Sequence, residues 1–205
     1  MHYNIITPIT RIHNFETLKN MIESQNYLHL TWHLLLDHDN STTIDRKSYP
    51  NWIKWHRFNN NYTDCDKGHT SINSFLDATV LNANERYNIL CDDDAYELAF
   101  FQKLNRYSSK VIICSMERGK SIPTGLAPIK SHPTTKLWAC KEAMKVCHVG
   151  MEQLVISGDL LSKYRIPSQM WGDGMLIEKI VAENHVDYAP EISVLFNYYE
   201  PGRWK

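Results

Sequence analysis

The chain has 205 residues, of which 43% are hydrophobic and 22% are charged, a balance that is typical of one globular domain with a sizeable core. Its 22 Lys and Arg residues almost equal its 23 Asp and Glu residues, which gives a formal net charge of -1. Because proteins that bind nucleic acid by neutralising its phosphates need an excess of positive charge, we expect no nucleic-acid partner.

The chain also lacks the sequence features of a secreted or membrane protein. No apolar stretch is long enough to span a bilayer, and the first residues lack the apolar run of a signal peptide. Five cysteines, an odd number without a CxxC pair, fit reduced thiols better than a disulfide framework. We therefore expect no transmembrane segment and a cytoplasmic location.

Strand and helix patterns alternate along the first half of the chain. Apolar runs predict strands at 3–6, 28–38, 53–58, 87–91 and 110–116. Apolar residues at helical spacing predict helices that begin near 14 and 71 and one that spans 95–104. This order predicts an α/β fold with a mostly parallel central sheet that is flanked by helices.

The pattern changes after Gly119. We expect a loop at 119–135, helical structure at 136–147, an apolar run at 151–161, a loop at 165–174, a helix at 175–184 and an aromatic run at 194–204. Ligands of open α/β sheets bind beyond the carboxyl ends of the strands. Polar residues follow three predicted strands, at 7–11, 37–39 and 92–94, and these segments are the expected place of a binding site.

Three consecutive aspartates, Asp92, Asp93 and Asp94, follow the apolar run at 87–91. Neighbouring carboxylates repel one another unless a cation or hydrogen-bond donors neutralise them. Because successive strand residues point to opposite faces, we expect Asp92 and Asp94 on one side and Asp93 on the other. Two carboxylates on one side suit Mg²⁺ or Mn²⁺ with substrate phosphates. The alternative is that the aspartates cap a following helix.

Several segments resemble, in the same order, the GT-A glycosyltransferases, and especially the large inverting family numbered two. They are NIITPITR at 4–11, LLLDHDNST at 34–42, NILCDDDAYE at 88–97, VGMEQLVISGDLL at 149–161 and MWGDGMLIEKI at 170–180. The resemblance implies a single domain over 1–205 with the GT-A (Rossmann-like) fold. It also implies a nucleotide-binding half at about 1–118 and an acceptor-binding half at about 119–205.

The resemblance implies a metal-dependent glycosyltransferase that moves a sugar from a nucleotide-diphosphate sugar to a hydroxyl acceptor, with inversion. It implies Mn²⁺ or Mg²⁺ as the cofactor, with Asp92 and Asp94 as metal ligands. The nucleotide-sugar-binding residues that it implies are Thr7, Pro8, Arg11, Asp37, Asp39, Asp92 and Asp93, where Asp39 substitutes for Asp37 if the loop holds one extra residue. The acceptor stays open among a glycan, a lipid-linked sugar and a protein.

Asp173 matches the second residue of the family's Glu-Asp pair, which is the general base in inverting relatives. Gly172 stands in place of the glutamate, and Asp173 could instead cap a helix that begins near 175. Trp171 is the expected platform for the acceptor. Glu152 and Glu178 are the alternatives for the base. Relatives often supply a third metal ligand from a C-terminal histidine, a role that is left here to Glu200 or to no residue.

Three other functions stay open. A catalytically inactive nucleotide-sugar-binding module would keep the fold and lose the base, which the glycine before Asp173 allows. A phosphatase or phosphotransferase of the haloacid dehalogenase type also uses a DxD, but with Thr or Val where this chain has Tyr96, and in its first strand. A sugar nucleotidyltransferase needs a glycine-rich, Arg-containing loop after the first strand, and TPITR contains no glycine.

Overall fold

The computed structural model describes residues 1–36, 48–58, 68–118, 135–146, 149–169 and 171–196. Their strands are β1 Tyr3–Ile9, β2 Leu30–Leu36, β3 Ile53–Arg57, β4 Arg86–Ile89, β5 Ala95–Tyr96, β6 Val111–Arg118, β7 Thr135–Leu137, β8 Leu154–Ser157 and β9 Val186–Phe196. The α-helices are α1 Phe15–Ser24, α2 His69–Ala78, α3 Phe100–Leu104, α4 Gly158–Leu161 and α5 Gly172–Glu183. The 3₁₀ helices that bear on the site are η1 Ile12–Asn14, η4 Lys141–Ala143 and η5 Met151–Gln153.

The nine described strands form one sheet in the order β3-β2-β1-β4-β8-β6-β9-β5, and β7 pairs with β6. The pairs β2–β3, β1–β2, β1–β4 and β6–β9 are parallel. Strand β8 is antiparallel to both of its neighbours, and β5 and β7 are antiparallel to β9 and β6. Six of the nine described strands therefore share one direction, and the predicted α/β fold with a mostly parallel sheet is confirmed.

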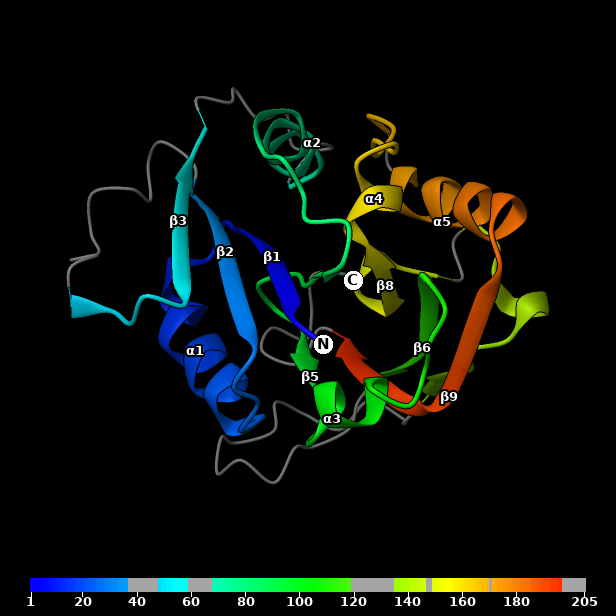
Figure 1. Ribbon diagram of the computed structural model, residues 1–205, viewed down its shortest axis with the longest axis horizontal. Coiled ribbons are helices and arrows are strands. Elements are labelled where there is room, and N and C mark those ends of the chain that lie inside the picture. The colour runs from blue at the N-terminus through cyan, green and yellow to red at the C-terminus, as the bar shows by residue number, and fades with distance from the viewer. Residues whose placement is uncertain (37–47, 59–67, 119–134, 147–148, 170, 197–205) are drawn as a thin grey trace.

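Helices cover both faces of this sheet, with α1 and α3 on one side and α2, α4 and α5 on the other (Figure 1). Ile5 and Ile6 are neighbours on β1, and each is fully buried in a different hydrophobic cluster. Ile5 packs in the cluster that contains α1 and α3, whereas Ile6 packs in the cluster that contains α2 and α5. Because both faces are covered, every residue of β1 is buried, including the polar Asn4 and Thr7.

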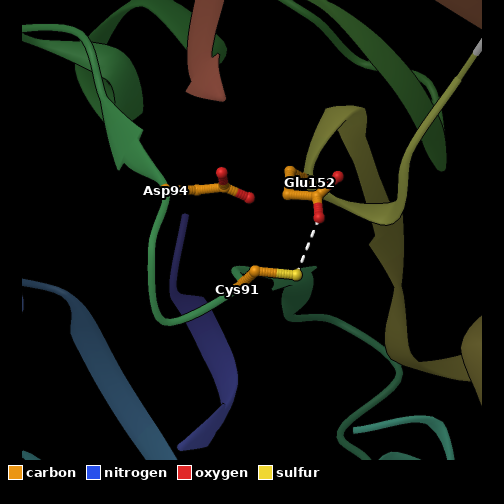
Figure 2. A group of neighbouring side chains, drawn as sticks. All are labelled: Cys91, Asp94 and Glu152. Carbon is orange, nitrogen blue, oxygen red and sulfur yellow. Dashed lines mark hydrogen bonds between the residues drawn. The ribbon is translucent and has the colours of Figure 1, made fainter. Parts of the chain in front are cut away.

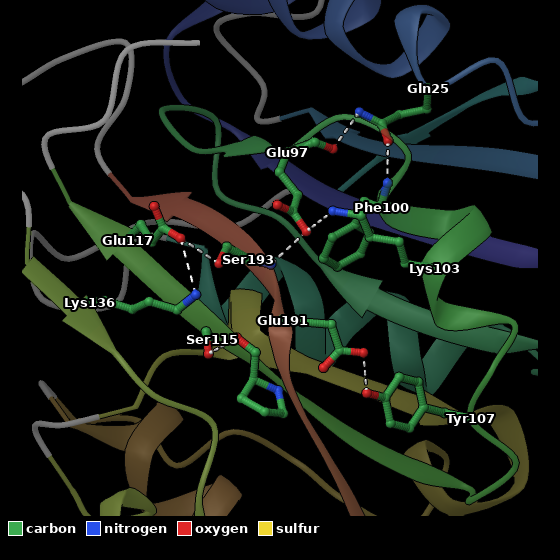
Figure 3. Close-up of polar contacts among 11 residues, drawn as sticks. Gln25, Glu97, Phe100, Lys103, Tyr107, Ser115, Glu117, Lys136, Glu191 and Ser193 are labelled. Carbon is green, nitrogen blue, oxygen red and sulfur yellow. Dashed lines mark hydrogen bonds and ion pairs between the residues drawn. The ribbon is translucent and has the colours of Figure 1, made fainter.

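A polar network ties the last strand to its neighbours (Figure 3). Oε1 of Glu97 accepts hydrogen bonds from the backbone N–H of Ser193 at 3.0 Å and from Lys103 at 2.8 Å. The Ser193 hydroxyl donates to Oε1 of Glu117 at 2.8 Å, and Lys136 lies 3.3 Å from the same oxygen. These contacts join α3, β6, β7 and β9 around groups that would be costly to bury without partners.

Two of the element predictions are wrong. The segment at 136–147, expected to be helical, contains the end of β7 and the short helix η4. The predicted helix at 95–104 begins instead with β5, and only 100–104 are helical. In both cases a strand forms because a distant partner pairs with it, β6 for β7 and β9 for β5. Local periodicity carries no information about such partners.

Candidate functional site

The three aspartates lie in a tight turn that follows β4. The backbone N–H of Asp94 donates to the carbonyl oxygen of Cys91 at 3.2 Å, which places Asp92 and Asp93 at the corner of the turn. All three are buried. Leu90 still pairs with Ile6 of β1 at 3.0 Å, so the turn lies at the carboxyl ends of two parallel strands, the expected place for a ligand.

Asp92 connects the end of β1 to this turn by hydrogen bonds. Its Oδ2 accepts hydrogen bonds from the backbone N–H groups of Thr10 and Arg11, both at 2.6 Å, and from the Thr10 hydroxyl at 3.0 Å. The Asn14 side chain donates to the Asp92 carbonyl oxygen at 2.9 Å. The first aspartate therefore binds the segment between β1 and α1 through several short contacts.

The Arg11 guanidinium bridges the first two aspartates. Its Nη1 forms a short ion pair with Oδ1 of Asp92, and its Nη2 lies 3.1 Å from Oδ2 of Asp93. Burial raises the pKa of Asp93, Arg11 opposes this shift, and the charge of Asp92 adds to it. In this conformation a cationic side chain therefore neutralises part of the negative charge of the turn.

Asp94 belongs to a different group of side chains. Its carboxylate, the Cys91 thiol and the Glu152 carboxylate offer ligand atoms that lie within 4.8 Å of one another (Figure 2). The Cys91 thiol donates to Oε1 of Glu152 at 2.8 Å. Burial raises the pKa of Glu152, hydrogen bonds with Cys91 and Asp94 oppose the shift, and the negative charge of Asp173 adds to it. Burial also raises the pKa of the Cys91 thiol.

The position of Glu152 depends on contacts made by neighbouring residues. The Asn88 side chain donates to the carbonyl oxygens of Glu152 at 2.9 Å and of Leu154 at 2.7 Å, and the Tyr96 hydroxyl donates to Asn88. A Cβ on Gly150 would stand 2.3 Å from Oε2 of Glu152, so the glycine leaves room for the carboxylate. The sequence alone does not place Glu152 beside the aspartates, and its only signal is an acidic residue within the apolar run at 151–161.

Asp173 reaches the same site from the first turn of α5. Burial raises its pKa, while the N–H of Gly174 and the charge of His69 oppose the rise. His69 begins α2, and Gly68 before it has φ +96° and packs on Pro8 so closely that a Cβ would lie 2.9 Å from Pro8 Cγ. Residue 68 must therefore be glycine for α2 to begin beside the end of β1.

Gly172, which stands where the family has a glutamate, has no space for a side chain. A Cβ at this position would lie 2.0 Å from the carbonyl oxygen of Pro167. The backbone N–H of Gly172 also donates to the carbonyl of Gln169 at 2.9 Å. This close approach of the backbone leaves no room for the glutamate that the family resemblance would place at 172. Glu152, on another segment, is close enough to Asp173 for the negative charge of Asp173 to raise its pKa.

The expectation that Asp92 and Asp94 share one side is wrong. Alternation requires extended backbone, and β4 ends at Ile89, before the turn. Asp92 and Asp93 therefore both contact Arg11, whereas Asp94 lies beside Glu152.

The structure places the other predicted residues as follows. Thr7 is fully buried, and its hydroxyl accepts a hydrogen bond from the Trp32 indole at 3.0 Å, so it lies beneath the site and not on its surface. Pro8 is also buried, against Gly68. Trp171 directly precedes α5 and is 46% exposed, as an acceptor platform would be. The predicted residues outside the described part of the chain are Asp37, Asp39 and Glu200.

Two sets of carboxylates in the described residues differ in how well they fit a divalent cation. Both oxygens of Asp92 already accept from N–H groups, so Asp92 fits poorly while Arg11 is in place. Asp94 and Glu152 fit better, because two buried carboxylates lie in contact and Oε2 of Glu152 has no hydrogen-bond partner among the described residues. Carboxylate oxygens suit Mg²⁺ and Mn²⁺, while the thiol of Cys91 is a softer donor.

Among the described helices, none combines the length and apolar character that a membrane span needs. No family model matches the chain, and no curated protein sequence matches it. Solved structures do resemble it, at low sequence identity.

The chain is similar to TarS of S. aureus, with 14% identity and a TM-score of 0.60, over 96% of this chain and 35% of that one. It is also similar to the mannosyltransferase PcManGT from Pyrobaculum calidifontis in complex with GDP-Man and Mn²⁺, with 14% identity and a TM-score of 0.63, over 99% and 58% of the two chains. HddC from Yersinia pseudotuberculosis matches with 10% identity and a TM-score of 0.54, over 95% and 92%.

The chain thus spans about a third of TarS and little more than half of the mannosyltransferase. At these identities the likeness concerns the fold, and it agrees with the sequence motifs and with the strand order. The chain has a GT-A, glycosyltransferase-like fold.

Proposed function

We propose that the chain is a glycosyltransferase that moves a sugar from a nucleotide-diphosphate sugar to a hydroxyl acceptor. The observation that carries this proposal is the convergence of Arg11, the aspartate turn, Glu152 and Asp173 at the carboxyl ends of β1 and β4. This end of an open α/β sheet is where nucleotide ligands bind. The likeness to a mannosyltransferase in complex with GDP-Man and Mn²⁺ supports the same class of donor.

In this proposal residues 1–118 form the donor half. The guanidinium of Arg11 matches the fork of oxygens that a diphosphate presents. The first N–H groups of α2, placed beside Pro8 by Gly68, favour an anion at the same end of the sheet. Asp37, or Asp39, would accept hydrogen bonds from the nucleobase, as the family resemblance implies.

Asp94 and Glu152 would hold a divalent cation, Mn²⁺ or Mg²⁺, with the donor's diphosphate completing its coordination. A bound cation of this kind stabilises the negative charge that develops on the leaving diphosphate. Asp93, with Arg11 on one of its oxygens, would contribute negative charge next to this position. Asp92 would act mainly by keeping the end of β1 on the turn.

Residues 119–205 would form the acceptor half, with Asp173 as the general base and Trp171 as the acceptor platform. Asp173 would accept the proton of the acceptor hydroxyl while the oxygen attacks the anomeric carbon from the side opposite the diphosphate. The outcome is inversion. A carboxylate whose pKa is raised by burial is a better base near neutral pH than an exposed one. A cytoplasmic location remains a prediction from the sequence.

Titration calorimetry with UDP-, GDP- and dTDP-sugars, each in Mn²⁺ and again in EDTA, tests the donor class. We expect one class to bind only when the cation is present. A CMP-sugar, which has no diphosphate, is the matched negative control. Release of free nucleotide in the presence of candidate acceptors then measures transfer.

The competing proposal is a catalytically inactive binding module, which the absence of a glutamate at 172 favours. Metal-dependent donor binding without any release of nucleotide would support that module. If no nucleotide-diphosphate sugar binds in Mn²⁺, both proposals fail.

A further inference from the structure

Arg11 makes two kinds of contact with the aspartate turn, and they are separable. Its backbone N–H donates to Oδ2 of Asp92 at 2.6 Å, next to the parallel contact from the N–H of Thr10. Its guanidinium reaches the other oxygen of Asp92 and, at 3.1 Å, Oδ2 of Asp93. The backbone contacts would keep the end of β1 bound to the turn even if the Arg11 guanidinium changed partner.

The guanidinium lies on Asp92 and Asp93, which directly precede Asp94, one of the two residues proposed to hold the cation. A divalent ion at the turn and the Arg11 side chain carry charges of the same sign, and their repulsion is strong in a largely buried site. The Arg11 side chain is 14% exposed and that of Asp92 is 4% exposed. The ion and the guanidinium therefore each weaken the binding of the other to neighbouring carboxylates of the turn.

A diphosphate changes this balance. It presents the planar pairs of oxygens that guanidinium binds best, and it carries the negative charge that Arg11 would lose on leaving the aspartates. Since the loop at Thr10 is held by its backbone, the side chain can change partner without a change of fold.

We infer, on the basis of the proposed function, that Arg11 is an exchangeable counter-ion of the donor site. Without ligands it neutralises Asp92 and Asp93. When a divalent cation and the donor bind at Asp94 and Glu152, the guanidinium passes to the diphosphate of the donor. Arg11 thus weakens binding of the free cation and strengthens binding of the cation together with the diphosphate.

The first experiment titrates Mn²⁺ alone into the wild type and into Arg11→Gln, Arg11→Lys and Arg165→Gln. We expect Arg11→Gln to bind Mn²⁺ roughly tenfold more tightly, because a competing positive charge is gone. Arg11→Lys keeps the charge and should stay near the wild type. Arg165 forms a surface ion pair with Asp77 at 2.7 Å. Arg165→Gln therefore removes one arginine charge outside the site and should leave the Mn²⁺ affinity unchanged.

The second experiment titrates inorganic pyrophosphate into the same proteins, each saturated with Mn²⁺. Arg11→Gln should bind pyrophosphate about tenfold more weakly than the wild type, because the guanidinium no longer donates to the phosphate oxygens. The two affinities should therefore change in opposite directions. Thermal unfolding of each variant checks that the fold is kept.

If Arg11 had only a structural role, Arg11→Gln would bind both Mn²⁺ and pyrophosphate more weakly. That result would overturn the inference. So would an unchanged Mn²⁺ affinity in Arg11→Gln, or no Mn²⁺ binding by any of the proteins. If the wild type transfers sugar but the opposite changes are missing, this inference fails and the proposed function stands. If the opposite changes are seen but no nucleotide-diphosphate sugar binds, the proposed function fails.

Discussion

The backbone of Gly172 lies so close to Pro167 that a Cβ on the glycine would stand 2.0 Å from the proline carbonyl oxygen. Residue 172 therefore has no room for the glutamate that the family resemblance would place before Asp173. We expect Gly172→Ala to lower the stability of the fold by about 1 to 3 kcal/mol, the usual cost of overpacking, and Gly172→Glu to lower it further. Urea denaturation measures this, with the exposed Lys179→Ala in the same helix as the control. Wild-type stability in Gly172→Glu would contradict the close approach.

Replacement of Asp173 by asparagine tests the assignment of the base. Asp173→Asn keeps the size of the side chain but cannot accept a proton near neutral pH. Donor and Mn²⁺ affinity should stay near the wild-type values, while the rate of transfer falls by about 10²- to 10⁴-fold.

The matched control is Glu178→Gln, in the same helix. Oε1 of Glu178 accepts a hydrogen bond from the backbone N–H of Val146 at 2.7 Å, a contact that a glutamine oxygen can keep, so transfer should be unaffected. If Asp173→Asn retains full transfer, Glu152 becomes the next candidate for the base.

Replacement by asparagine should have different effects on stability and Mn²⁺ affinity at Asp92 and at Asp94. In Asp92→Asn, the shared acceptor of two backbone N–H groups is weakened, and we expect a loss of about 1 to 3 kcal/mol of stability. In Asp94→Asn, one of two buried carboxylates in contact loses its charge, so the metal-free protein should not lose stability. Mn²⁺ affinity should fall. Urea denaturation and calorimetry measure the two effects, and a large loss of metal-free stability in Asp94→Asn would refute the division of roles.

A half-buried pair of histidines predicts sensitivity to acid. Nδ1 of His33 lies 3.0 Å from Nε2 of His56, and Nε2 of His33 lies 3.1 Å from Oδ1 of Asn4. Burial, together with the charge of His56, lowers the pKa of His33 from 6.5 to about 3. The folded state thus favours neutral His33, so this contribution to stability is complete above pH 6.5 and is lost as the pH falls toward 3.

Thermal unfolding between pH 7.5 and 4.5 tests this. The Tm of the wild type should fall more steeply than that of His33→Gln, which can keep hydrogen bonds but does not titrate. His185→Gln, at a largely exposed position, should behave like the wild type. Parallel curves for all three proteins would show that His33 does not contribute.

The sequence predicted the elements that are determined by residues close together in the chain. Strand β1 is a run of buried residues, and α1 buries Leu18 and Ile22 at helical spacing. The arrangement of the site depends instead on a turn and on contacts between segments that are far apart in the sequence. Nothing in the triplet at 92–94 distinguishes a strand end from a turn, and Glu152 reaches Asp94 from 58 residues further along the chain through contacts of Asn88 and Tyr96.

The interleaved strands have a consequence for how the chain can be divided. The order β4-β8-β6-β9-β5 alternates strands from 1–118 with strands from 119–205. A chain cut after residue 118 would leave β4, β5 and β6 with open hydrogen-bonding edges, and edges of this kind promote aggregation. The proposed donor and acceptor halves thus share one interleaved sheet, and we expect neither to fold when it is expressed alone.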